Sequence, residues 1–295
     1  MKPVRISLWI LCACFVSVAW GQQPAGKCVN NWSEFHRTNM VRWNQCEQVL
    51  NVNNVGGLGL KWSYTSAGGR SSPAVANGVV YVGSDDNNVY ALNARTGAQL
   101  WSYATGNIVG SSPAVSNGVV YVGSYDNNVY ALNAKTGAKL WSYATGFNVG
   151  SSPAVANGVV YIGSYTGNVY ALNAKTGAKL WSYTTGSWVL SSPAVANGMV
   201  YVGSQDGNLY ALTARTGAKV WSYNAGPYVY SSPAVANGVV YVGSDDNNVY
   251  ALNARTGAKL WSYATGNAVD SAPSVANGVV YVSSEDVKVY VFGLK

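Results

Sequence analysis

The side chains best suited to metal or redox chemistry are few in this chain, and they lie near its start. Only four cysteines and one histidine occur among 295 residues, and two of the cysteines fall within an apolar leader. Cys28 and Cys46 remain, with His36 between them. Two thiolates and one imidazole form an incomplete zinc site, whereas two cysteines in an oxidising compartment usually pair. We therefore expect a disulfide between Cys28 and Cys46, with a metal pair as the alternative.

Carboxylates are the second kind of candidate. Turns such as Asp85-Asp86-Asn87-Asn88 combine oxygen ligands of the kind that calcium prefers, but Asp-Asn segments are also ordinary turns. The sequence contains no Gly-x-Ser-x-Gly elbow, no phosphate-binding loop and no metal-ligand motif. We expect no catalytic residue, no metal and no cofactor, and hence a protein that is not an enzyme.

Aromatic side chains are the third kind, and they point to binding rather than catalysis. They interrupt polar turns that are otherwise repetitive, and they can stack on sugars or anchor a partner protein. The alternative is drift in solvent-facing loops after duplication. We predict a surface that binds a protein or a glycan, made by Tyr125, Phe147, Tyr165, Trp188, Tyr228 and Tyr230.

These candidates are positioned by a repeat of 40 residues. The pattern Ser-x-Pro-x-Val recurs at that interval, starting at Ser71, Ser111, Ser151, Ser191, Ser231 and Ser271. No stretch has sustained helical periodicity, and a period of this size with short strands is typical of a propeller blade or a solenoid. In the first unit we predict strands over 73–76, 79–83, 89–93 and 99–104.

The turns within the unit are also specified locally. Asn77-Gly78 is a strong tight-turn signal, and Gly97 is expected at positive φ. The run Val79 to Val82 is apolar on both faces, which indicates a strand packed between neighbouring sheets.

The two ends of the repeat region favour a ring over a rod. The last unit contains only three strands before Lys295, and Leu60–Tyr64 matches the missing fourth strand. We predict an all-β fold: a six-bladed β-propeller of four-stranded antiparallel blades, closed by the N-terminal strand that completes the last blade. The alternative, a solenoid, would need distinct caps at its ends.

The segment Ala91-Leu-Asn-Ala-Arg-Thr-Gly-Ala-Gln-Leu-Trp101 resembles the tryptophan-docking motif of pyrroloquinoline-quinone (PQQ) dehydrogenase-type propellers. The motif recurs in each full unit, and the resemblance covers 58–295, with a related fold in the outer-membrane assembly factor propeller (BamB-like). It implies that one tryptophan per blade docks neighbouring blades, namely Trp62, Trp101, Trp141, Trp181, Trp221 and Trp261.

The same resemblance leaves two functional alternatives open. Quinoprotein enzymes of this family have a larger, eight-bladed ring, hold the quinone against a disulfide of adjacent cysteines, and use an Asp base and a calcium ion. This sequence has no adjacent cysteines after the leader, and nearly every ring position is copied six times. We expect a non-enzymatic binding scaffold; the alternatives are a PQQ-dependent dehydrogenase with calcium and an envelope-assembly scaffold.

Charge and sequence variation divide between the two rims of the predicted ring. Because strand directions alternate, the turn after the second strand and the links between blades share one rim, which carries nine acids and most of the variation. The other rim carries the Thr-Gly turns and nine Lys and Arg residues. An acidic mouth could attract cations or basic partners, and a basic floor could lie on anionic lipid or polysaccharide. The simpler alternative is a solvating pattern that was duplicated with the unit.

The start of the chain predicts export. A basic start is followed by an apolar run and small residues, so we expect a signal peptide at 1–21, a lead-in with the disulfide at 22–57 and the propeller at 58–295. Alternatives are an uncleaved anchor and lipidation at Leu11–Cys14. Removal of Lys2 and Arg5 lowers the formal charge from +7 to +5, with no basic run that would suggest nucleic acid. We expect a secreted or periplasmic monomer without a spanning segment after cleavage.

Overall fold

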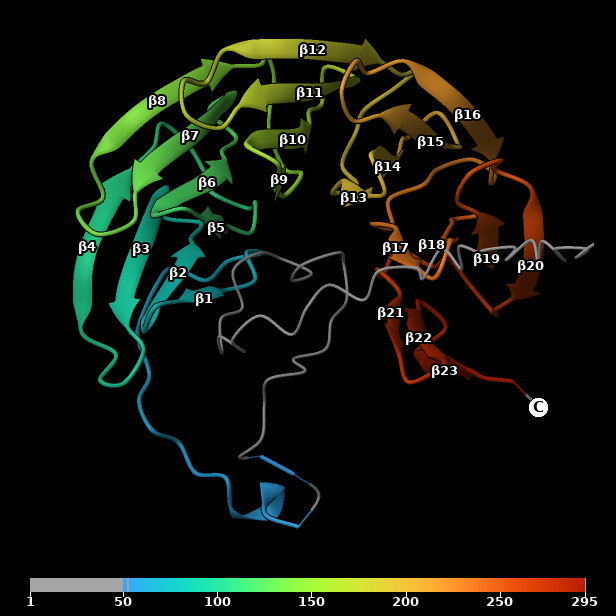
Figure 1. Ribbon diagram of the computed structural model, residues 1–295. Coiled ribbons are helices and arrows are strands. Elements are labelled where there is room, and N and C mark those ends of the chain that lie inside the picture. The colour runs from blue at the N-terminus through green and yellow to red at the C-terminus, as the bar shows by residue number, and fades with distance from the viewer. Residues whose placement is uncertain (1–49, 52, 295) are drawn as a thin grey trace, which may run out of the picture.

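The computed structural model describes residues 50–51 and 53–294, and these residues form an arc of antiparallel sheets (Figure 1). The predicted signal peptide, the lead-in up to residue 49, and Cys28 and Cys46 lie outside the described residues. The disulfide and the domain boundaries therefore stay predictions. The only helical element described is a 3-10 turn at Val55–Gly57.

Five sheets have four strands and the sixth has three, and in each sheet consecutive strands are neighbours. From the inner to the outer strand, the sheets are β1 (Ala74–Ala76), β2 (Val79–Gly83), β3 (Asn88–Asn93) and β4 (Gln99–Ala104); β5 (Ala114–Ser116), β6 (Val119–Gly123), β7 (Asn128–Asn133) and β8 (Lys139–Ala144); β9 (Ala154–Ala156), β10 (Val159–Gly163), β11 (Asn168–Asn173) and β12 (Lys179–Thr184); β13 (Ala194–Ala196), β14 (Met199–Gly203), β15 (Asn208–Thr213) and β16 (Lys219–Asn224); β17 (Ala234–Ala236), β18 (Val239–Gly243), β19 (Asn248–Asn253) and β20 (Lys259–Ala264); and β21 (Ser274–Ala276), β22 (Val279–Ser284) and β23 (Lys288–Phe292).

Local turn chemistry explains why the strands begin and end where they do. Asn77 and Gly78 have φ of 51° and 76°, the pair of positive values that a two-residue hairpin turn requires. Gly97 has φ of 74°, as expected from the sequence. The four strands predicted for the first unit agree with the structure to within one residue at each end.

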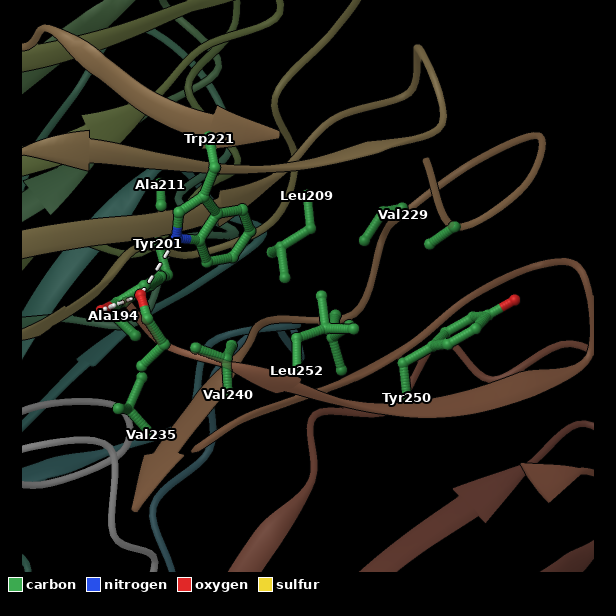
Figure 2. Close-up of a cluster of buried hydrophobic side chains, with 13 residues drawn as sticks. Ala194, Tyr201, Leu209, Ala211, Trp221, Val229, Val235, Val240, Tyr250 and Leu252 are labelled. Carbon is green, nitrogen blue, oxygen red and sulfur yellow. Dashed lines mark hydrogen bonds between the residues drawn. The ribbon is translucent and has the colours of Figure 1, made fainter. Parts of the chain in front are cut away.

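The core lies between the blades rather than within them. The middle strands are buried on both faces, because each sheet is packed between the two adjacent sheets of the arc. Figure 2 shows one such layer, in which Trp221 and Leu209 of one blade meet Val240 and Leu252 of the next. Each layer therefore buries apolar side chains from two blades at once.

Five of the six predicted docking tryptophans, all but Trp261, tie the outer edge of a layer to the following blade among the described residues. Trp101 Nε1 and Tyr81 Oη both donate to the carbonyl oxygen of Ala134 at 3.0 Å. The indole also covers Gly137, where φ is 73° and an added Cβ would lie 2.8 Å from the ring. The same hydrogen bond, at 2.9–3.0 Å, is made by Trp62, Trp141, Trp181 and Trp221.

Closure of the ring is not confirmed. The sheet of β21, β22 and β23 has no fourth strand among the described residues, and Val289 and Val291 of β23 are 70% and 58% exposed. The predicted partner, Leu60–Tyr64, lies instead against the first blade, where Trp62 docks. In Figure 1 the blue and red ends of the arc are separated. Leu60–Tyr64 thus contacts the first blade as the outer strand of a preceding blade would. The backbone hydrogen bonds predicted between this segment and β23 are not formed among the described residues.

Candidate functional site

The variable rim is built by two backbone segments that meet in every blade. These are the turn after each second strand and the link that enters the blade. Tyr125 N donates to Ile108 O at 2.9 Å, and the equivalent bonds join Tyr165 to Asn148 and Gln205 to Trp188. Because main-chain atoms make these bonds, the side chains here vary without disturbing the frame.

Four of the predicted aromatic residues form a continuous row on this rim, the aromatic row. Tyr165 is at its centre: its ring lies 5.2 Å from that of Trp188, nearly parallel at 16°. Phe147 and Tyr125 contact the same tyrosine with centroid distances of 6.4 and 5.9 Å. Trp188 is 44% exposed and Phe147 47%, so the row presents flat apolar surface to solvent.

The remaining two predicted residues, Tyr228 and Tyr230, form a separate pair with centroids 5.6 Å apart. The sequence analysis predicted one surface from all six aromatic residues, but the ring contact of Trp188 among the described residues is with Tyr165 and not with this pair. Gln205 links the two groups, since its backbone N donates to Trp188 O at 2.8 Å and its Nε2 lies 2.5 Å from Tyr230 Oη. Gln205 was not among the predicted site residues, although it occupies the same repeat position as Tyr125 and Tyr165.

An acidic corner lies at the end of the arc, next to the tyrosine pair. Asp245 is grouped there with Asp270, Glu285 and Asp246. Burial, a hydrogen bond with Asp270 and the surrounding negative charges together raise the pKa of Asp245 to about 7. Asp245 therefore titrates near neutral pH. The sequence analysis did not identify this corner as a unit, because its members come from different blades.

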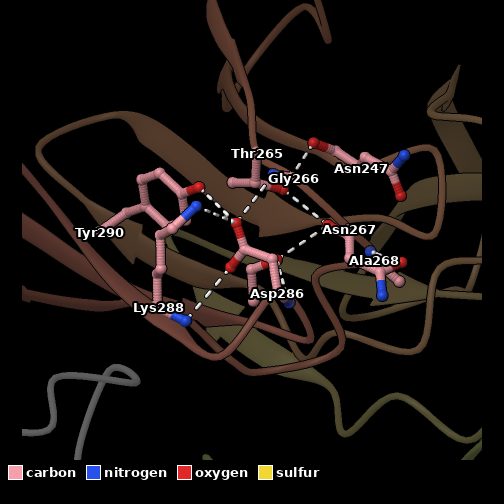
Figure 3. Close-up of polar contacts among 9 residues, drawn as sticks. Asn247, Thr265, Gly266, Asn267, Ala268, Asp286, Lys288 and Tyr290 are labelled. Atoms are coloured by element: carbon pink, nitrogen blue, oxygen red, sulfur yellow. Dashed lines mark hydrogen bonds and ion pairs between the residues drawn. The ribbon is translucent and has the colours of Figure 1, made fainter.

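The acid at the second position of these turns, where it occurs, has a structural role. In Figure 3, Asp286 Oδ2 accepts hydrogen bonds from Tyr290 Oη at 2.6 Å and Gly266 N at 3.0 Å, and Lys288 Nζ lies 3.3 Å away. The hydrogen bond from Tyr290 is the main cause that lowers the pKa of Asp286 to about 2. Asp126 and Asp206 make the same tyrosine bond at 2.6 Å. Their oxygens are occupied by the protein's own donors, as in an Asp-Asn turn.

Metal ligands and membrane-spanning helices can both be assessed for the part of the chain that the structure describes. No group of three or more His, Cys, Asp or Glu side chains in that part of the chain is arranged to hold a metal ion. Within residues 50–51 and 53–294, no helix is long and apolar enough to cross a membrane.

The repeat, the docking tryptophans and the blade geometry agree with a match to a protein family. The family described as outer membrane protein assembly factor BamB matches residues 36–147, 144–231 and 224–294. The chain belongs to this family. The predicted membership of a PQQ-like, BamB-like propeller group is thereby confirmed.

Curated relatives of this BamB-family chain are quinoprotein dehydrogenases. The dehydrogenase subunit of an alcohol dehydrogenase (quinone) from Gluconobacter oxydans is 30% identical over 124 residues, or 35% of this chain and 16% of that protein. The quinoprotein alcohol dehydrogenase PedE of Pseudomonas putida is 42% identical over 71 residues, covering 22% and 11% of the two chains. The chain therefore matches less than a fifth of the length of either relative.

Solved structures show the same fold. The quinohemoprotein alcohol dehydrogenase ADHIIG of Pseudomonas putida HK5 superposes with a TM-score of 0.76 at 22% identity, covering 86% of this chain and 57% of that one. BamB from Moraxella catarrhalis superposes with a TM-score of 0.51 at 25% identity, covering 74% and 80%. At these identities the likeness concerns the arrangement of blades, and function must be argued from the site.

Proposed function

We propose that this protein is a non-enzymatic binding scaffold of the periplasm or the cell exterior, and that the aromatic row on the variable rim holds a protein or glycan partner. The observation that carries this proposal is the exposed stack of Trp188 on Tyr165, flanked by Phe147. Flat aromatic surface held on a rigid frame recognises sugars and anchors protein interfaces at low entropic cost.

The position of the row supports the proposal. The links and turns of this rim differ from blade to blade, whereas the hairpin turns of the opposite rim are nearly identical. A repeated scaffold that varies on one rim concentrates specificity there. A BamB-like fold is also compatible with a role in envelope assembly through protein contacts, since the family is described as an assembly factor.

A partner screen with matched variants tests this function. Residues equivalent to Trp188 in other blades are Gly68, Ile108, Asn148, Tyr228 and Ala268, so Trp188→Ala introduces a residue that the repeat already accepts. We expect W188A combined with F147N to weaken partner capture, or glycan-array binding, by at least about tenfold, because a buried aromatic anchor contributes about 2 kcal/mol or more. I108A is the control on the same rim and should bind normally. Unchanged binding by the double variant would exclude the aromatic row.

The second candidate function is a PQQ-dependent dehydrogenase, favoured by the curated relatives. The residues of the variable rim do not fit the cofactor. PQQ carries three carboxylates, and this rim holds all nine described acids but only two cations, Arg70 and Lys288, of which Lys288 is paired with Asp286. Addition of PQQ and calcium, followed by spectroscopy and dye reduction with alcohols, tests this candidate. Bound cofactor with turnover would overturn the scaffold proposal.

We further propose that Leu60–Tyr64 completes the last blade and that the protein is then a closed, monomeric six-bladed ring. Two observations support closure: the segment already docks on the first blade as an outer strand does, and β23 presents an exposed edge of the same length. The register of β19 with β20, shifted by one repeat, would place Ser63 opposite Tyr290.

A further inference from the structure

The rim opposite the aromatic row carries a ring of cations, here called the basic rim. Its members lie in the turn between the third and fourth strands of a blade or at the first residue of the fourth strand, and all are exposed. They are Arg95, Lys135, Lys139, Lys175, Lys179, Arg215, Lys219, Arg255 and Lys259. Because these turns join the third and fourth strands of five sheets, they lie at the same end of each of those five sheets.

The charges of this rim are unneutralised. The single ion pair among the described residues joins Lys288 to Asp286 on the other rim, and no described Asp or Glu lies on the basic rim. A surface that serves only solubility usually mixes both signs. Here all nine described acids face one way and nine cations face the other, so the molecule is strongly polar along the ring axis.

Exposed apolar side chains accompany the cations. The second residue of each outer strand is aliphatic, and between 49% and 57% of it is exposed. In every blade of the set but the first, where Gln99 precedes it, this residue directly follows a Lys of the basic rim, as in Lys139-Leu140 and Lys179-Leu180. The full set is Leu100, Leu140, Leu180, Val220 and Leu260.

We infer that the basic rim is a docking surface for an anionic lipid bilayer. Electrostatic attraction to a charged surface fades within a Debye length of about 10 Å at 0.1 M salt, so cations act together only if they approach the surface together. The cations of the basic rim can approach a surface together, because their turns lie at the same end of five sheets. The adjacent leucines can enter the boundary between headgroups and acyl chains, as the apolar side of an interfacial helix does. A soluble polyanion would be attracted by the cations but would gain nothing from the leucines.

This surface is separate from the aromatic row and does not depend on the proposed function. If the basic rim lies on a membrane, the variable rim faces away from the bilayer, because the two rims are opposite ends of the same strands. A partner held on the aromatic row would then be presented to the compartment.

Sedimentation with lipid vesicles tests the inference. The chain itself supplies the matched substitution, since Gln99 occupies in the first blade the position that Lys139, Lys179 and Lys219 occupy in later blades. The full chain and a K139Q/K179Q/K219Q variant are compared on vesicles that mix phosphatidylglycerol with phosphatidylcholine. Each cation near an anionic surface is worth about a fivefold change in affinity, so the triple variant should bind at least about tenfold more weakly. R70Q removes a cation from the other rim and should bind like wild type.

Two further arms separate a bilayer from a soluble polyanion. L140S/L180S should lose vesicle binding while keeping its binding to dextran sulfate, whereas K139Q/K179Q/K219Q should lose both. Unfolding curves of K139Q/K179Q/K219Q and R70Q should coincide with wild type, since these side chains are exposed. L140S/L180S should remain folded at the temperature of the binding assay, because about half of each leucine is exposed. The inference is overturned if wild type sediments equally with pure phosphatidylcholine vesicles or with neither kind, if R70Q weakens binding as much as the triple variant, or if L140S/L180S binds vesicles normally.

Discussion

Trp62 Nε1 donates to the carbonyl oxygen of Ala94 at 3.0 Å, which is the bond that Trp101 makes with Ala134 one blade later. Gly97 beneath the Trp62 indole has φ of 74°, and Tyr64 lies 5.3 Å from Tyr90. A residue before the first strand thus performs the role of an outer-strand residue of a preceding blade. The first blade therefore has the same docking site for a preceding outer strand that the later blades have.

Ring closure can be tested by cross-linking. Substitution of Ser63 and Tyr290 by Cys should give an intramolecular disulfide if the segment pairs with β23, since directly opposite residues have Cβ atoms about 4.5–5.5 Å apart. The positive control is S102C with Y90C, a pair that is opposite within the first sheet. Mass mapping of the linked peptides distinguishes this bond from others. Cross-linking of the control alone would show that the ends stay apart.

The docking tryptophans should differ in importance along the chain. Trp141 is buried and donates to Ala174 O at 3.0 Å, so Trp141→Ala should lower the free energy of unfolding by about 3–5 kcal/mol. Trp261 is 37% exposed, and among the described residues its ring contacts are with Tyr263 and Phe292. Trp261→Ala should cost about half as much, as measured by urea unfolding. Equal losses would mean that Trp261 is covered in solution.

A pair of glycines separates backbone strain from docking. Gly177 and Gly158 have nearly equal φ of 73° and 75°, but an added Cβ at Gly177 would lie 2.7 Å from the Trp141 ring, whereas at Gly158 it meets nothing within 4 Å. Gly158→Ala should destabilise the protein by about 1 kcal/mol, from strain alone. Gly177→Ala should cost about 1–3 kcal/mol more, because it also displaces the indole. Similar melting temperatures for the two variants would argue against tight docking.

The acidic corner should give a pH-dependent stability. The pKa of Asp245 is raised to about 7 from an ordinary value of 3.8, so the folded state binds its proton more tightly than the unfolded state. This contribution is fully present below pH 3.8 and is lost as the pH rises through 7. Asp245→Asn should therefore leave stability unchanged at pH 4 and raise it at pH 8, by about 1 kcal/mol after allowance for solvent screening.

The measurement is chemical unfolding of wild type and D245N across this pH range. Other groups titrate in both proteins, so the difference between the two curves isolates Asp245. A constant difference, or a gain confined to low pH, would contradict the grouping of Asp245 with Asp270. Asp206→Asn serves as a contrast: hydrogen bonds outweigh burial and lower the pKa of Asp206, so its removal should cost stability near neutral pH.

The amino-acid sequence by itself determined the period, the strand bounds and the turns of this protein. These features depend on neighbours along the chain: Asn77-Gly78 needs positive φ at two consecutive residues, and Val79 to Gly83 is apolar on both faces. The repeat also indicated the docking tryptophans, because they recur at the same position of each unit. It indicated the aromatic residues of the variable rim, because they differ from the residues at the same position in other units.

Tertiary structure alone decided which of those residues meet. Trp188 stacks on Tyr165 from the turn of the preceding blade, Gln205 links the aromatic row to Tyr230, and Asp245 gathers acids from other repeats. The predicted pairing of Leu60–Tyr64 with β23 is unconfirmed, since the contacts of this segment among the described residues are with the first blade. Such contacts join the turn of one blade to a link between blades, far apart along the chain, and they depend on how the blades are placed in the arc. The curvature is the sum of the rotations between successive blades, and these rotations are set by packing between blades rather than by neighbours along the chain.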